Sequence, residues 1–430
     1  MRRLDHRSPD FDAQLAALEQ TSLFDPAVEA RTRDIIEAVR SRGNEALVEL
    51  TTRFDGWTPA SDAAFLINGA ELRDAGKAVS TKFKKAAKFA LRNIEFFNRR
   101  GLRRGWSARN PQGACVGEKY DPLQRVGIYV PGGTAPLVST SLMTVALARI
   151  AGCPERVVCT PANKGAVNPA LLYALRLAGA TEVYKLGGAQ AVAAMAFGTK
   201  TIGRVAKVFG PGNAYVVAAK RLLFGHVGVD LLPGPSELLV IADDSAPARL
   251  IAADMLAQAE HGSGDERVFL VTTSERIAVA VQGEMNRQLS ALSRRVFIEK
   301  TLANCGVVIV VGSLAQAAEV ANRIAPEHLE LICRGAKTLL PKLRTSGAIF
   351  IGPFSPTVAG DFVAGPSHEL PTGGAGRIFA GLTVDQFQRR TSIVEYSQQS
   401  LRRSLDAIQQ FADAEGLDAH GRSARIRFER

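Results

Sequence analysis

Four histidines of this chain lie in polar or helix-boundary segments, where an imidazole has little structural purpose. The chain has six histidines in 430 residues, and these four are His261, His328, His368 and His420. Imidazole is the commonest metal ligand among side chains, and it exchanges protons near neutral pH. Taken singly, each could be an ordinary core or surface histidine. Together they predict one assembled active site that contains a metal ion.

Two further polar residues, Gln258 and Asp361, could complete such a metal site. Gln258 and His261 are three apart in a run, residues 250–261, that reads as a helix, so both side chains should project from one face. Asp361 lies in a stretch of small residues that we expect to form a loop. A carboxylate, an amide oxygen and imidazoles suit a divalent ion such as zinc, with positions left for a substrate.

Glu327 and His328 form a second chemical pair, directly after Pro326. We expect a helix to begin here, which would point adjacent side chains about 100° apart. That geometry suits two separate roles better than joint binding of one ligand.

The five cysteines do not resemble metal ligands. Cys115, Cys153, Cys159, Cys305 and Cys333 form no Cys-x-x-Cys pair, and most lie in or beside apolar strands. We interpret them as reduced core residues rather than disulfides or zinc thiolates. Any metal site must then use His, Asp, Glu or Gln.

Composition places the chain among ordinary globular proteins. At 46% apolar and 22% charged residues, its length favours two or three domains with sizeable cores. The apolar runs fall short of the roughly 20 residues that a membrane span needs. The N-terminus has no apolar segment typical of export, so we expect a cytoplasmic protein without a membrane partner.

The net charge of +11 raises the question of nucleic acid binding. The basic residues gather at 82–88, 99–104 and 422–430, and no base-reading motif accompanies them. We therefore interpret them as solvated helix faces and expect no nucleic acid partner. Attraction of anionic metabolites or of a dinucleotide would be a secondary effect.

The pattern of strands and helices must position these side chains. Helical periodicity covers most of residues 1–107, and short β-branched runs then alternate with helices rich in Ala and Leu. Four such runs occur within residues 125–209 and four more within 237–351. The fold class we predict is α/β, with two tandem Rossmann-like parallel-sheet units, a helical N-terminal segment and a helical C-terminal tail. Ligands of such sheets sit at the carboxyl ends of strands.

Glycine-rich turns follow several of the predicted strands, at residues 131–133, 187–190, 210–213 and 233–236. None is a dinucleotide fingerprint or a Walker A loop. Each could be a structural turn. Because all four lie where a strand ends, we interpret them as backbone amides that face a phosphate-bearing ligand.

Eight segments resemble, in the same order, the motifs of the histidinol dehydrogenase family. The resemblance spans nearly the whole chain, and the segments are 130–136, 187–191, 210–216, 234–237, 258–261, 322–330, 368–372 and 415–420. It implies a zinc-dependent, NAD-linked, four-electron oxidation of L-histidinol to L-histidine through the aldehyde, with one Zn²⁺ per subunit. It also implies a homodimer that exchanges its C-terminal tails.

The resemblance further implies roles for individual residues. The catalytic pair would be Glu327 and His328. The zinc ligands would be Gln258, His261, Asp361 and His420. The NAD contacts would be Tyr129, Gln190 and Asn213. The substrate contacts would be Ser236, Gln258, His261, His328, Asp361, Glu415 and His420.

From these patterns we expect four regions. Residues 1–24 form an N-terminal helical arm, and residues 25–124 with 235–384 form a first α/β domain that carries the metal and catalytic residues. Residues 125–234 form a second α/β domain on the NAD side. Residues 385–430 form a helical dimerisation tail.

Some residues depart from the family's usual pattern. Pro233 stands where Ala is usual, Ser367 precedes His368 where Asn is commoner, and the residue after His261 is Gly rather than acidic. The alternative is therefore the same chemistry on another small amino or hydroxy alcohol, such as a sulfopropanediol. A catalytically idle, basic nucleotide-binding scaffold is disfavoured, because the pair Glu327 and His328 is intact.

Overall fold

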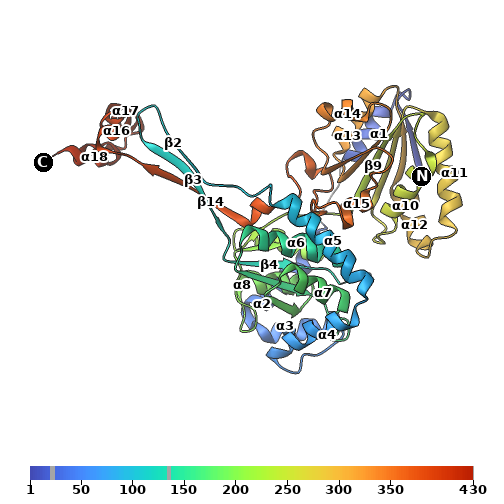
Figure 1. Ribbon diagram of the computed structural model, residues 1–430, viewed down its shortest axis with the longest axis horizontal. Coiled ribbons are helices and arrows are strands. Elements are labelled where there is room, and N and C mark those ends of the chain that lie inside the picture. Colours follow the sequence, from blue (N-terminus) through green and yellow to red (C-terminus); the bar gives the residue numbers. More distant parts are fainter. Residues whose placement is uncertain (20–24, 133–136, 430) are drawn as a thin grey trace.

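The computed structural model describes residues 1–19, 25–132 and 137–429. It contains two α/β units, each built on a parallel sheet, and an arm that projects away from both and carries the C-terminus (Figure 1). No helix in the described ranges combines the length and the apolar character needed to cross a membrane. The α/β fold class with two parallel sheets is confirmed.

The first unit is a six-stranded parallel sheet in the order β1-β11-β10-β9-β12-β13. Its strands are β1 (Arg2–Asp5), β9 (Glu237–Ala242), β10 (Arg267–Thr272), β11 (Gly306–Val310), β12 (His328–Ile332) and β13 (Ala348–Ile351). The central strands are buried on both faces, as the continuous apolar runs of a parallel sheet require.

Side chains alternate between the two faces of this sheet. Odd-numbered residues of β9 to β12 pack against α1 (Phe11–Glu19) and α13 (Leu314–Ile324). Even-numbered residues pack against α10 (Ala248–Ala259), α11 (Glu275–Leu289) and α12 (Arg295–Cys305). His328 therefore belongs to the face that α10 covers.

The second unit is a five-stranded parallel sheet in the order β6-β5-β4-β7-β8. Its strands are β4 (Arg125–Tyr129), β5 (Glu155–Thr160), β6 (Glu182–Lys185), β7 (Lys207–Phe209) and β8 (Gly228–Val229). One core is shared with α4 (Gly69–Ala78), α5 (Thr81–Asn98), α6 (Val138–Ala151) and α7 (Pro169–Ala178). The other is shared with α2 (Pro26–Arg42), α3 (Asn44–Asp55), α8 (Gly188–Phe197) and α9 (Ala214–Leu223).

The arm is an antiparallel sheet that ends in helices. Its strands, in the order β14-β3-β2, are β2 (Trp106–Arg109), β3 (Cys115–Pro122) and β14 (Gln388–Glu395). The helices are α16 (Gln398–Arg402), α17 (Leu405–Glu415) and α18 (Asp418–Arg425). Val394 and Phe411 expose 65% and 69% of their surface. The arm thus presents apolar side chains that its own chain does not bury.

Short elements complete the described chain. These are the helices α14 (Ala336–Leu339) and α15 (Thr357–Phe362) and the 3-10 turns η1 (Asp62–Phe65), η2 (Leu340–Lys342), η3 (Ala375–Arg377), η4 (Val384–Phe387) and η5 (Ile426–Phe428).

Three regional expectations differ from this architecture. The expected helical arm at residues 1–24 contains β1, which pairs with β11 at the sheet edge before α1 begins. The helices of residues 25–124 pack on the five-stranded sheet rather than joining residues 235–384. The tail 385–430 is not purely helical, because β14 pairs along its whole length with β3. In each case, sheet pairing or burial of an apolar face outweighed the local pattern.

Candidate active site

The pair Glu327 and His328 lies where β12 begins, and not in a helix as the sequence led us to expect. His328 opens the strand and pairs in register with Leu238 of β9. Leu329 and Leu331 alternate with polar neighbours and fill one side of the core, so the period-two pattern decides the local structure.

Glu327 is held by the start of β9. Its Oε2 accepts hydrogen bonds from the backbone N–H of Glu237, at 2.8 Å, and from the hydroxyl of Ser236. The same carboxylate oxygen lies 3.4 Å from His328 Nδ1. Ser236, expected as a substrate contact, thus also orients the carboxylate.

Three histidines near this point are oriented in the same way. Nδ1 of His261 contacts the carbonyl of Gln258 at 3.0 Å, Nδ1 of His328 that of Glu237 at 3.0 Å, and Nδ1 of His368 that of Asp361 at 2.9 Å. A carbonyl only accepts, so each Nδ1 carries the proton. In their neutral forms, His261 and His368 then keep a lone pair on Nε2 for a metal or a hydrogen bond, whereas Nε2 of His328 faces the carboxylate of Asp361.

Asp361 connects these groups. It lies in the short helix α15 rather than in a loop, and its Oδ1 is 3.6 Å from His328 Nε2. Burial opposes its ionisation, but the hydrogen bond with His328, together with the electrostatic attraction of His328, His368 and His261, holds the pKa of Asp361 below its ordinary value. Asp361 is therefore an ionised carboxylate among imidazoles.

The charges around His328 alter its proton affinity. Burial alone would lower the pKa of His328, but the carboxylates of Glu327 and Asp361 outweigh burial and raise it to about 9. Burial raises the pKa of Glu327, although the neighbouring His328 opposes that effect. This differs from our expectation of an imidazole pKa near neutral.

Gln258 and His261 approach the site from the end of α10. The helix stops at Ala259, so the two residues do not share one helical face as predicted. The backbone contact between them brings them together instead. Gln258 is 3% exposed, and its side-chain nitrogen has no hydrogen-bond partner in the described chain. Its amide is therefore available to a ligand.

Glu415 and His420 do not join this cluster within one chain. Both are exposed, on α17 and α18, at the far end of the arm from α10 and α15 (Figure 1). Accordingly, no group of three His, Cys, Asp or Glu side chains that could hold a metal occurs within residues 1–19, 25–132 and 137–429.

The cluster does not lie at the carboxyl ends of its own sheet's strands, where we expected a ligand site. In the six-stranded sheet, Ser236, Glu327 and His328 precede or open their strands, so they lie at the amino edge and not the carboxyl edge. The carboxyl edge of the five-stranded sheet lies beside these residues. Thr140, in the first turn of α6 after β4, contacts His368 Nε2 at 2.9 Å.

The three residues expected to contact NAD lie at that carboxyl edge. Tyr129 ends β4, Gln190 lies in the first turn of α8 and Asn213 caps α9, where its side chain accepts the N–H groups of Tyr215 and Val216. Tyr129 and Gln190 are buried, whereas Asn213 is exposed.

Glycine amides in three of the four glycine-rich turns are already bonded within the protein and so do not face a phosphate, contrary to our interpretation. Side chains of the protein already accept their hydrogen bonds. The pairs, donor first, are Gly187 with Asp55, Gly188 with Tyr129, Gly210 with Asp230 and Gly234 with Thr372. The fourth turn, at residues 131–133, ends outside the described residues.

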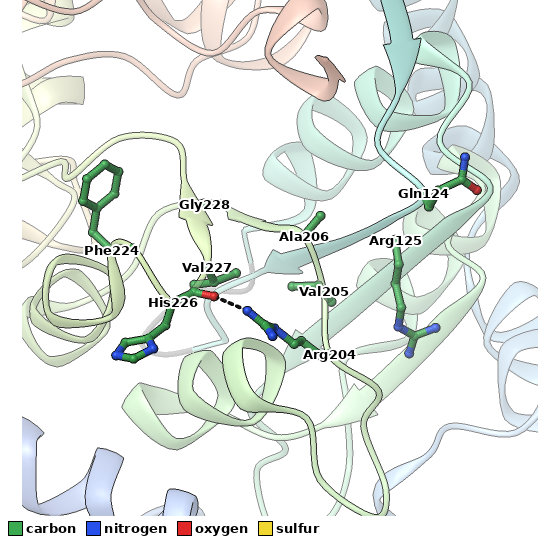
Figure 2. Close-up of a pocket in the computed structure, with 10 residues that line it drawn as sticks. Gln124, Arg125, Arg204, Val205, Ala206, Phe224, His226, Val227 and Gly228 are labelled. Atoms are coloured by element: carbon green, nitrogen blue, oxygen red, sulfur yellow. Dashed lines mark hydrogen bonds between the residues drawn. The ribbon is translucent and has the colours of Figure 1, made fainter. Parts of the chain in front are cut away.

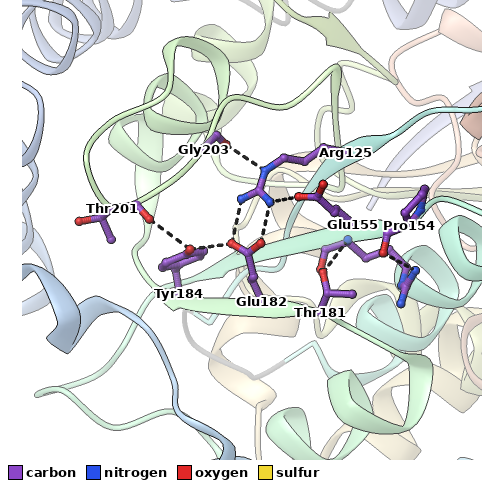
Figure 3. Close-up of polar contacts among 9 residues, drawn as sticks. Arg125, Pro154, Glu155, Thr181, Glu182, Tyr184, Thr201 and Gly203 are labelled. Carbon is purple, nitrogen blue, oxygen red and sulfur yellow. Dashed lines mark hydrogen bonds and ion pairs between the residues drawn. The ribbon is translucent and has the colours of Figure 1, made fainter.

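A cavity of about 560 Å³ lies at the opposite edge of the five-stranded sheet (Figure 2). Its lining includes Phe224, His226 and Arg204, which donates to the carbonyl of His226 at 2.6 Å. Its other cation, Arg125, forms two hydrogen bonds with Glu182, at 2.6 and 2.8 Å (Figure 3). No expected site residue lines this cavity, and its arginines already have partners.

Several residues around the site were absent from the sequence prediction. Arg267 pairs with the buried Glu237 at 2.8 Å and so supports the strand that holds Glu327. His368 was among the unusual histidines, but nothing in the sequence joined it to Thr140. Glu237 directly follows Ser236 in the 234–237 motif, and its place in that motif was the one sequence feature that could have identified it as a site residue.

Comparisons with known proteins identify the family of this chain. The family model described as histidinol dehydrogenase matches residues 18–428. Histidinol dehydrogenase of Heliobacterium mobile is 44% identical over 98% of each chain, and that of Geobacter sulfurreducens is 44% identical over 99% of this chain and 100% of its own. A crystal structure of histidinol dehydrogenase from Elizabethkingia anophelis superposes with a TM-score of 0.94 at 33% identity, covering 100% of this chain and 98% of that one. An acetylating aldehyde dehydrogenase from Geobacillus thermoglucosidasius, at 14% identity and a TM-score of 0.50, shares the fold alone. The chain is a dehydrogenase and belongs to the histidinol dehydrogenase family.

Proposed function

We propose that this enzyme oxidises L-histidinol to L-histidine through histidinal, with zinc bound and with two NAD molecules reduced in turn. The main support for the proposal is the contact between the two α/β units, made by Thr140 and His368. The proton-transfer residues of one sheet lie at its amino edge, beside the carboxyl edge of the other, where α/β sheets bind dinucleotides. The family relationship adds the substrate.

The side chains of the pair divide the proton transfers. In its neutral form, which its raised pKa of about 9 shifts to alkaline pH, His328 accepts the hydroxyl proton at Nε2 while hydride leaves the alcohol carbon for NAD, since its Nδ1 is fixed on a backbone carbonyl. Glu327 then deprotonates the water that attacks the aldehyde. Its Oε2 is already oriented by Ser236 and by the N–H of Glu237. The resulting hydrate releases the second hydride.

The residues of the metal site fit zinc. His261 presents a free Nε2, Asp361 is ionised and the amide of Gln258 is unpaired and can turn its oxygen outward. These are zinc's usual nitrogen and oxygen ligands. When bound, zinc would orient the amino group and imidazole of the substrate and offset the Asp361 charge that raises the pKa of His328.

The dinucleotide residues fit NAD. Tyr129, Gln190 and Asn213 line one sheet edge, where the chain turns from strand to helix. Because the neighbouring glycine amides are bonded within the protein, recognition rests on these side chains and on the shape of the turns rather than on free N–H groups.

The tail residues complete the site from a second copy of the chain. Glu415 and His420 are exposed at the end of an arm that leaves its own subunit (Figure 1). In a two-fold symmetric homodimer, each arm reaches the other subunit, so His420 becomes the fourth zinc ligand and Glu415 a substrate contact.

Steady-state NAD reduction with a panel of alcohols tests the proposal. The purified zinc enzyme is expected to turn over L-histidinol and L-histidinal with kcat/KM at least about 100-fold above 2,3-dihydroxypropanesulfonate and simple amino alcohols, because a site built for polar groups rejects analogues that lack them. Greater turnover of the sulfonate would establish the alternative substrate instead.

A further inference from the structure

A buried ion pair lies at the dinucleotide edge of the five-stranded sheet. Lys220 on α9 and Asp230, just after β8, expose 0% and 2% of their side chains, and Lys220 Nζ pairs with Asp230 Oδ1. Full burial of two charges is costly, and such a pair often stabilises a fold no more than apolar residues of similar volume would. We therefore looked for a role of this ion pair other than stabilisation of the fold.

Both members of the pair bind the same residue, Gly210. The backbone N–H of Gly210 donates to Asp230 Oδ2 at 2.7 Å. The carbonyl of Gly210 accepts a hydrogen bond from Lys220 Nζ at 2.8 Å. Charge-assisted hydrogen bonds are about twice as strong as neutral ones, so this residue is held from both sides.

Gly210 is a position where the backbone needs to be held. Its φ is +104°, which L side chains rarely adopt, and a Cβ there would lie 2.1 Å from the carbonyl oxygen of Tyr129. Gly210 directly follows β7 and begins the turn to Asn213, which caps α9. Holding Gly210 thus fixes the exposed Asn213 relative to the buried Tyr129, two residues of the expected NAD site.

We propose that Lys220 and Asp230 are positioning residues that set the 210–213 turn for the dinucleotide. The proposal rests on the proposed NAD-linked function. Neither side chain is free to touch NAD, since both are buried and occupied, so their effect on the cofactor passes through Gly210 and Asn213.

The test separates positioning from stability. The double variant Lys220→Met/Asp230→Leu removes both charges of the pair together, so neither is left buried without the other and the zinc enzyme is expected to stay folded. It should bind NADH about tenfold more weakly by fluorescence titration, and its KM for NAD should rise by a similar factor, because small misplacements of binding groups are costly. KM for L-histidinol should change less than about twofold.

A matched control uses a second ion pair of the same sheet. Arg125 and Glu182 bond at the amino edge, away from the expected site (Figure 3). The variant Arg125→Met/Glu182→Leu should leave the affinity for NADH unchanged, even if its melting temperature falls. A folded Lys220→Met/Asp230→Leu enzyme with wild-type affinity for NADH would overturn the proposal.

A measurement on the wild-type protein remains decisive if the double variant fails to fold. Hydrogen exchange of the Gly210 amide should be as slow as in β7, and NADH should not change it, because the protein already holds that group. Exchange at the rate of exposed loops would refute the holding role, whether or not L-histidinol is a substrate. Absence of turnover by the wild type would count against the proposed function alone.

Discussion

Mixing two inactive variants should restore part of the activity if the arms are exchanged. His420→Ala damages only the arm, and His261→Asn damages only the body of the subunit. Figure 1 shows that α18, which carries His420, lies far from α10, which ends two residues before His261. In a mixed dimer one site then receives both lesions and the other receives none. Random exchange makes half of the dimers mixed, so about a quarter of wild-type activity should return.

The assay is NADH formation from L-histidinol after the two variants are mixed under conditions that exchange subunits. Native mass spectrometry counts the mixed dimers, and each variant incubated alone is the control. Recovery should follow the mixed fraction in proportion. Verified mixed dimers without recovery would refute the reasoning, because His420 would then serve its own subunit or would not be a ligand.

Four single substitutions test separate parts of the site. His261→Asn and Asp361→Ala should each abolish tight zinc binding, since an open site loses its geometry with one ligand; stoichiometric zinc by elemental analysis would reject the assignment. Glu327→Gln should impair oxidation of supplied aldehyde more than oxidation of the alcohol, and equal losses would contradict the division of labour. Arg267→Ala should lower the free energy of unfolding by about 3–5 kcal/mol, because the buried Glu237 loses its cation. A loss below about 1 kcal/mol in urea denaturation would show that the pair matters little.

Long apolar patterns made much of the fold predictable. Among the runs expected within residues 125–209 and 237–351 are the strands β4, β9 and β10, since buried parallel strands are continuous β-branched runs. β1 was missed because Arg2-Arg-Leu-Asp5 is short and polar, and only pairing with β11 at the sheet edge makes it a strand.

β12 was assigned the wrong structure for a local reason. Pro326 resembles a helix start, but Leu329 and Leu331 reveal their two-residue period only once the neighbouring strands β9 and β13 are known. At Glu327 and His328, pairing with the neighbouring strands therefore overrides a short local signal for a helix.

The site residues were found by type and motif, but their geometry was not. No sequence pattern indicates that three histidines use Nδ1 on backbone carbonyls, or that Asp230 and Asp55 occupy glycine amides, because these contacts join distant segments. The amino-edge position of His328 was equally hidden, since it depends on the direction of β12 in the sheet.

The stoichiometry of the complete reaction tests the central claim most directly. The wild-type enzyme, incubated with zinc, a limiting amount of L-histidinol and excess NAD, should form about two NADH per alcohol consumed and yield L-histidine, because the aldehyde is hydrated and oxidised in the same site. One NADH per alcohol, with histidinal accumulating, would contradict a four-electron role for Glu327 and His328. No NADH at all would reject histidinol as the substrate.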